Sequence, residues 1–196
     1  MCIINQNLTK SKVLISFGAM DGGFEYAWAI KKQLDDMMGE NYAYIDAISL
    51  ENDPSTSYNW NEALAIYKME NPNWETYFKL TMENCETMIL LITTPWLESQ
   101  WCNMELEWLI EELKIRNIKV IPVIFEDALQ HINTNPNLQI FKEFFDTNSE
   151  STVTVFGNVE EIENVTAVIN GREHIYHYRY AVDADIMNTI VHRIID

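Results

Sequence analysis

The fold class is decided by residues 87–125, TMILLITTPWLESQWCNMELEWLIEELKIRNIKVIPVIF. Two mainly apolar runs, at 87–93 and 119–125, flank a segment whose apolar residues recur at helical spacing. Short apolar runs of this kind predict strands that are buried on both faces, and the segment at 98–116 predicts one long helix between them. A strand, a helix and a second strand in this order form the repeating unit of a parallel sheet.

The same alternation continues towards the N-terminus. The run KVLISF, residues 12–17, predicts a strand that leads into the glycine-bearing loop GAMDGG, and Gly39 is placed to end the following helix. The expected elements in this part are strands at 12–17 and 42–47 and helices at 24–38, 60–70 and 74–85. Together with residues 87–125 they predict a flavodoxin-like α/β fold, a three-layer sandwich around a central parallel sheet.

The pattern after residue 125 is weaker. Asn170-Gly171 is the dipeptide that a type I′ turn favours, and it separates two runs of strand-like residues. We expect a short helix at 137–146, a hairpin of strands at 165–169 and 174–180, and a closing helix from Asp183, its N-cap, to Ile195. No linker or repeat divides the chain, which predicts a single domain over 1–196, with a core at about 10–125 and an elaborated part at 126–196.

Composition limits the classes of partner. Of the 196 residues 47% are hydrophobic and 22% charged, which is typical of a globular protein. The formal net charge of −17 argues against binding to nucleic acid or to an anionic membrane surface. The most apolar stretch, residues 88–97, is too short to span a bilayer. Three cysteines without a CxxC pair fit a reducing compartment, so we expect a cytoplasmic protein.

The predicted helix at 98–116 has two adjacent faces of different character. Cys102, Leu106, Leu109 and Leu113 form an apolar stripe that should face the sheet. Trp101 and Glu105 lie one turn apart on the neighbouring stripe, which also carries Trp108 and Glu112. This spacing places an aromatic plane and a carboxylate at one wall of a cleft. From spacing alone, an exposed Trp beside a solvated Glu is the alternative interpretation.

Three segments in order resemble the Toll/interleukin receptor (TIR) domain family. KVLISF resembles the first box of the family, and YIDAISLENDPS resembles its second strand and following loop, with Asp46 at the strand end. LLITTPWLESQWCNMEL resembles the third strand and the S-x-W-C-x-x-E-L signature that opens the next helix. The first box departs from the family pattern, because Lys12 stands where an acidic residue is usual and the loop is rich in glycine instead of basic residues.

The resemblance implies an enzyme of the bacterial NAD-consuming branch. Such members break the nicotinamide–ribose bond with a Glu on this helix, which makes Glu105 the expected catalytic residue. Loss of nicotinamide leaves an oxocarbenium-like ribose, whose positive charge a carboxylate stabilises. An indole stacks on a cationic pyridinium ring, so Trp101 is the expected substrate-binding aromatic.

Further substrate contacts are expected at the carboxyl ends of the strands, where ligands bind in open α/β sheets. The residues placed there are Ser16, Phe17, Gly18, Asp46, Ser49 and Glu51. Backbone N–H groups around Gly18, Gly22 and Gly23 are candidates to receive pyrophosphate. We expect no metal site and no bound cofactor, NAD being a substrate; His174 and His177 fall on opposite faces of a predicted strand.

The layout resembles the stand-alone TIR protein of Thoeris antiphage systems. The resemblance implies an NAD glycohydrolase, ADP-ribosyl cyclase or transferase that makes nicotinamide and a cyclised or conjugated ADP-ribose derivative. That nucleotide would signal to a downstream effector protein in antiviral defence. The resemblance also implies that the protein self-associates on activation and responds to a phage-derived trigger.

Two alternatives remain at this level. One is a non-catalytic TIR module that docks to other proteins, for which Glu105 is dispensable and the loop at 49–59 is not. The other is an enzyme like the nucleoside deoxyribosyltransferases, which share the sandwich and also break N-glycosidic bonds with a Glu. That enzyme would prefer free nucleosides to NAD and would form a covalent sugar intermediate.

Overall fold

The structure is a computed structural model that describes residues 10–18, 22–45, 74–135, 138–156, 159–169 and 172–195. The predicted helix at 60–70 and the predicted Asn170-Gly171 turn lie outside these residues. Within the described ranges, no helix has the length and apolar character needed to cross a membrane.

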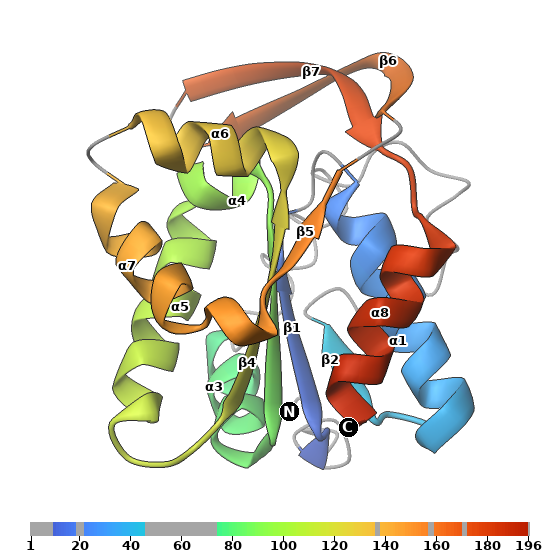
Figure 1. The fold of residues 1–196 in the computed structure, drawn as a ribbon, viewed down its shortest axis with the longest axis vertical. Coiled ribbons are helices and arrows are strands. Elements are labelled where there is room, and N and C mark those ends of the chain that lie inside the picture. Colours follow the sequence, from blue (N-terminus) through green and yellow to red (C-terminus); the bar gives the residue numbers. More distant parts are fainter. Residues whose placement is uncertain are drawn as a thin grey trace.

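A five-stranded parallel sheet forms the centre of the molecule, in the strand order β2-β1-β3-β4-β5 (Figure 1). Its strands are β1 (Val13–Phe17), β2 (Ala43–Ile45), β3 (Thr87–Ile92), β4 (Lys119–Phe125) and β5 (Val153–Val155). Every residue of β1 and β3 is buried, as expected for strands that are covered on both faces. The prediction of a flavodoxin-like α/β sandwich is confirmed.

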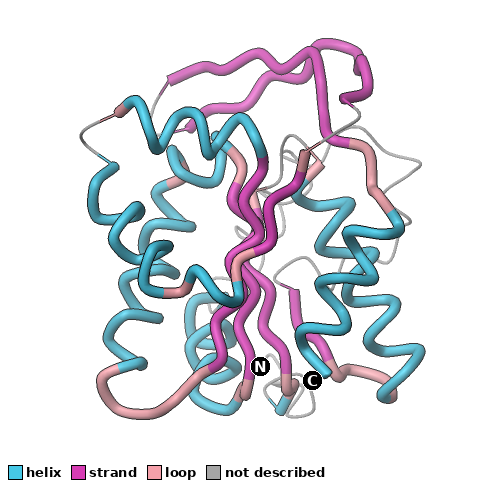
Figure 2. Tube along the Cα trace, in the orientation of Figure 1, coloured by secondary structure: helices cyan, strands magenta, loops and turns pink. Residues whose placement is uncertain are grey.

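Helices cover both faces of this sheet (Figure 2). One face carries α1 (Gly23–Met38) and α8 (Ala184–Ile195). The other carries α3 (Trp74–Asn84), α4 (Thr94–Glu98), α5 (Gln100–Leu113), α6 (Glu126–Thr134) and α7 (Gln139–Thr147). Each layer packs its own apolar core against the sheet, so the described residues form one hydrophobic cluster on each side.

Side chains of β1 alternate between these two clusters. Ile15 and Phe17 belong to the cluster under α1 and α8, whereas Leu14 belongs to the cluster under α5. The period of two places Ser16 on the same face as Leu14. This alternation decides which end-of-strand residue of β1 meets α5.

The predicted helix at 98–116 is present as α5, which spans 100–113, and the short helix α4 before it was not predicted. Two helices occur, α4 and α5, and they are separated at Ser99. Thr93 caps α4 by accepting a hydrogen bond from the Trp96 N–H, and Pro95 lies in its first turn, so the helical region begins four residues earlier than expected. Ser99 has extended backbone angles and accepts from the Cys102 N–H at 3.4 Å, which starts α5 as a separate helix.

The elaborated part adds a fifth strand and a hairpin. The strand β5 and the helix α6 were not predicted, whereas α7 overlaps the expected helix at 137–146. A short 3-10 helix, η4 (Ser149–Ser151), precedes β5, and β6 (Val159–Ile169) pairs antiparallel with β7 (Arg172–Tyr180). Ile169 is paired with Arg172, which is the register that a two-residue turn requires. The predicted hairpin is confirmed in its pairing.

The hairpin lies across the carboxyl ends of the sheet strands (Figure 1). Its last residue, Tyr180, is buried against Phe125 with ring centroids 5.0 Å apart, and its hydroxyl accepts from the Asp127 N–H at 3.3 Å. The hydroxyl of Tyr26 donates to the Ala181 carbonyl at 2.8 Å and accepts from the Asp183 N–H at 3.0 Å. Burial raises the pKa of Tyr26 above its ordinary value, which favours the protonated hydroxyl that donates to Ala181.

Asp183 caps the closing helix, as predicted. Its Oδ1 accepts from the N–H groups of Asp185 and Ile186, both at 2.9 Å. We expect Asp183→Ala to lower the free energy of unfolding by about 1 kcal/mol, because it leaves two N–H groups of α8 without this acceptor. Urea unfolding followed by circular dichroism measures the change. Asp183→Asn, which keeps a capping oxygen, is the control and should stay near the wild type; equal losses for the two variants would contradict the capping role.

Candidate active site

Ser16 and Glu105 meet at the carboxyl edge of the sheet. Ser16 is the last residue but one of β1, and Glu105 lies in the second turn of α5. The Ser16 hydroxyl donates to Glu105 Oε2 at 2.5 Å, a short distance that is typical of an O–H group bound to a carboxylate. These two predicted site residues, 89 positions apart in sequence, are therefore in direct contact.

The Glu105 side chain is buried, with a relative exposure of 4%. The interpretation of Glu105 as a solvated residue is therefore wrong. A carboxylate removed from water costs free energy unless hydrogen bonds compensate for the loss. Groups of this kind are concentrated in functional sites, which makes Glu105 the strongest candidate for chemistry among the described residues.

The faces of α5 follow the predicted stripes. Cys102, Leu106 and Leu109 are buried against the sheet, and Leu113 is half-buried. The thiol of Cys102 lies 3.6 Å from the Phe17 carbonyl, in keeping with a packing role. Trp101, one turn before Glu105, exposes 43% of its surface. The helix thus presents an accessible indole next to a buried carboxylate.

Trp96 is a residue of the site that sequence reasoning missed. Its indole N–H donates to the Ser16 hydroxyl at 2.9 Å, and the side chain is fully buried. The available signal was Thr93-Thr94-Pro95, an N-cap residue followed by a proline, which marks a helix start before Trp96. Because one long helix was expected from residue 98, Trp96 was assigned to no element.

Phe17 and Gly18 do not contact Glu105 through side chains. The Phe17 ring lies in the core on the opposite side of the sheet and packs edge-on against Phe24, with centroids 5.5 Å apart. Gly18 passes so close to α4 that an added Cβ would lie 3.1 Å from the Trp96 backbone nitrogen. Gly18 therefore allows the end of β1 to pack against the first turn of α4.

The remaining predicted contacts lie outside the described residues. They are Asp46, Ser49 and Glu51. The glycines of the loop after β1 are described in part: Gly22 has a positive φ of 82° and precedes the first turn of α1. No cluster of three or more His, Cys, Asp or Glu side chains suited to a metal ion occurs within the described ranges.

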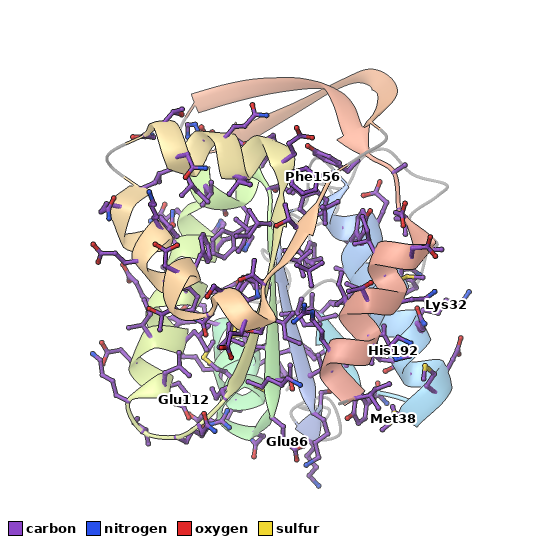
Figure 3. The ribbon with its side chains drawn as sticks, viewed as in Figure 1. Lys32, Met38, Glu86, Glu112, Phe156 and His192 are labelled. Atoms are coloured by element: carbon purple, nitrogen blue, oxygen red, sulfur yellow. The ribbon has the colours of Figure 1, made fainter. Side chains whose placement is uncertain are left out.

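A small cavity lies on the other face of the sheet, next to the cluster under α1 and α8. It has a volume of about 50 Å³ and is lined by Tyr26, Val155, Phe156, Tyr180, Ala181, Val182 and Asp183. Figure 3 shows Phe156 at the end of the molecule covered by the hairpin, whereas Glu86 and Glu112 lie at the other end. The volume is suited to water and not to a nucleotide, so we assign no substrate to this cavity.

Comparison with known proteins gives a family match and a similar protein of named activity. A model of the TIR domain family matches residues 56–153, half of the chain. The chain is 36% identical over 125 residues to the 3′ cyclic ADP-D-ribose synthase HopAM1 of Pseudomonas syringae pv. tomato. That alignment covers 60% of this chain and 45% of HopAM1, so the matched part spans less than half of the relative. No solved structure matches the chain significantly.

The family match covers α4, which holds Trp96, and α5, which holds Trp101 and Glu105. It also covers the flanking strands β3 and β4. The strand order of the sheet is that of a flavodoxin-like fold, which agrees with the fold expected from the resemblance. The chain belongs to the TIR domain family.

Proposed function

We propose that this TIR protein cleaves NAD at the nicotinamide–ribose bond, with Glu105 as the catalytic residue. The observation that carries the proposal is a buried carboxylate at the carboxyl edge of the sheet, bound by Ser16 and followed towards solvent by the half-exposed Trp101. Ligands of open α/β sheets bind at this edge. The similarity to HopAM1, named as a 3′ cyclic ADP-D-ribose synthase, supports NAD as the substrate.

The chemistry follows from charge. When the C1′–N bond breaks, the bonding electron pair leaves with nicotinamide, and positive charge develops on the ribose ring. A carboxylate in a site that excludes water stabilises this charge more strongly than one in water. Trp101 would stack on the pyridinium ring of the bound substrate through a cation–π contact.

The product class is the second part of the proposal. The vacated C1′ is attacked by a group of the same molecule in cyclisation, by water in hydrolysis, or by another acceptor in conjugation. The name of HopAM1 supports cyclisation, and we propose a cyclised ADP-ribose as the main product. From the resemblance to Thoeris proteins we propose a role in antiphage signalling. In this role a phage-derived trigger activates the protein, the protein self-associates, and an effector senses the nucleotide product.

Mass spectrometry of nucleotides tests this function. Cells that strongly express the protein are compared with cells that express Glu105→Gln at the same level. We expect NAD to fall and a new ADP-ribose-containing species to accumulate only with the wild type. A product lighter than ADP-ribose by one water is cyclised, one of equal mass is hydrolysed, and a heavier one is conjugated. Identical profiles with and without phage challenge would contradict the proposal and favour a docking module.

Trp101→Ala tests the contact with the pyridinium ring. We expect KM for NAD to rise about 2- to 30-fold, because a cation–π contact contributes about 0.5–2 kcal/mol to binding. The fold should be retained, since the indole is 43% exposed. Initial-rate kinetics over a range of NAD concentrations give the value, and Trp101→Phe, which keeps an aromatic face, should restore most of the affinity. An unchanged KM for Trp101→Ala would exclude stacking at this position.

A further inference from the structure

Three buried side chains form a hydrogen-bonded chain that ends at the candidate catalytic carboxylate. Trp96 Nε1 lies 2.9 Å from Ser16 Oγ, and Ser16 Oγ lies 2.5 Å from Glu105 Oε2. The exposed fractions of the three residues are 0%, 1% and 4%. They come from three elements, α4, β1 and α5, and therefore join the sheet to the two helices that follow β3.

The direction of the protons in this chain is fixed by chemistry. An indole N–H is a donor only, so the Ser16 oxygen must accept from Trp96. The hydroxyl has a single proton, and an ionised carboxylate is an acceptor only. With Glu105 ionised, as its proposed role requires, the Ser16 proton is directed at Glu105, and the indole holds the hydroxyl in that orientation. Without the indole N–H, the hydroxyl could rotate about its Cβ–Oγ bond.

The position of Trp96 is itself firmly defined. Its backbone N–H is capped by Thr93 Oγ1 at 3.3 Å, and its ring packs edge-on against Phe141 with centroids 6.1 Å apart. An added Cβ on Gly18 would lie 3.1 to 3.2 Å from atoms of Thr93 and Trp96, which shows how closely β1 and α4 pack. Asp127 Oδ2 also accepts from the Thr94 N–H at 3.1 Å. The first turn of α4 is thereby held against the strand that carries Ser16.

We propose that Trp96 and Ser16 are positioning residues that hold the Glu105 carboxylate in the orientation needed to stabilise the reacting ribose. This inference rests on the proposed function of Glu105. Trp96 acts only through Ser16, because its indole N–H donates a hydrogen bond to the Ser16 hydroxyl and not to the carboxylate. The arrangement also explains why a tryptophan with a buried N–H lies at this point of the core, where an apolar ring of similar size would fill the space.

Four purified proteins test the inference: the wild type, Ser16→Ala, Trp96→Phe and the double variant. We expect each single variant to lower kcat for NAD about 10- to 100-fold with little change in KM, since small displacements of a catalytic group cost factors of this size. The double variant should be no slower than Ser16→Ala. The inference would be overturned if kcat of the double variant fell by the product of the two single factors. The two substitutions would then act independently, and packing alone would explain the effect of Trp96.

Matched variants separate hydrogen bonding from packing. Trp108→Phe makes the same substitution at a half-buried position of α5 and should leave kcat near the wild type. If Trp96→Phe does not fold, benzothienylalanine at position 96 replaces only the N–H by sulfur and keeps the shape of the ring. Full activity of that variant would overturn the inference, and a loss equal to that of Ser16→Ala would support it.

A spectroscopic readout separates this inference from the proposed function. The indole ¹⁵N–¹H resonance of Trp96 should shift in Ser16→Ala and in Glu105→Gln, and it should stay in place in Glu107→Gln, an exposed site on the same helix. If the Trp96 indole resonance keeps its chemical shift in Ser16→Ala, the hydrogen bond between Trp96 and Ser16 is refuted, even if the wild type cleaves NAD. If the wild type shows no NAD turnover under any condition, the proposed function is refuted. The catalytic role of the hydrogen-bonded Trp96, Ser16 and Glu105 is then refuted too, even if the resonance shifts.

Discussion

Glu105→Gln is expected to lower kcat for NAD cleavage about 10²- to 10³-fold, the size of loss seen when one preorganised stabilising group is removed from an active site. Glutamine has nearly the same shape as glutamate, and its carbonyl oxygen can still accept from the Ser16 hydroxyl. The substitution therefore removes the negative charge and leaves the packing at this buried position intact. The expected loss reflects a developing positive charge on ribose that a neutral amide does not stabilise.

Discontinuous assays of nicotinamide release, with thermal melting of each protein, measure this effect. Glu107→Gln is the matched control, because it makes the same change of charge at an exposed position two residues further along α5. It should retain wild-type kcat. Equal activity of Glu105→Gln and the wild type would assign catalysis to another group. If Glu105→Gln instead melted far below the wild type, the carboxylate would be chiefly structural.

The helix α5 shows what local sequence can predict and where it stops. Apolar spacing correctly predicted that Cys102, Leu106 and Leu109 face the sheet. Spacing on a helix gives only the angle of Glu105 relative to these residues, not what covers it. Glu105 is buried because β1 brings Ser16 to the same place, and that contact joins residues 89 positions apart. No periodicity within α5 contains this information.

Strand alternation explains the different outcomes for two adjacent predicted contacts. Ser16 and Phe17 were both expected at the substrate edge, yet only Ser16 lies on the face of β1 that meets α5. Phe17 belongs to the core under α1. A period of two predicts opposite faces for neighbours, but the sequence alone does not show which face receives α5.

The elements that were missed are short or begin with polar residues. The strand β5 has only three residues, Val153–Val155, and is stabilised by pairing with β4, so its local signal is weak. The helix α6 begins directly after β4, with Glu126 and Asp127 in its first turn, and Phe125 offers no capping side chain. Tertiary pairing and packing, more than local propensity, define this region.

Gly22→Ala is expected to lower the free energy of unfolding by about 2–4 kcal/mol, the sum of a left-handed backbone conformation and a steric overlap. Gly22 has φ 82° and ψ −1°, a region that residues with a Cβ adopt at a cost. An added Cβ would lie 2.3 Å from the Tyr180 carbonyl oxygen, so the backbone at the end of β7 must move. Tyr180 is buried against Phe125, and this packing opposes the movement.

Gly39→Ala is a second substitution at positive φ, without the overlap and in a different backbone region, with ψ 157° instead of −1°. Gly39 also has a positive φ, of 111°, but an added Cβ there meets no atom within 4 Å. It ends α1 at the surface, where the chain can relax, so we expect a smaller loss than at Gly22. Urea unfolding of the two variants and the wild type gives the comparison. A loss at Gly22 of no more than about 1–2 kcal/mol, the cost of the left-handed conformation alone, would show that the end of β7 moves freely, and Tyr180 would then not anchor the β6–β7 hairpin to the loop before α1. A larger loss at Gly22, together with reduced NAD cleavage in the folded variant, would show that this anchor also supports the end of the sheet that holds Ser16 and Glu105.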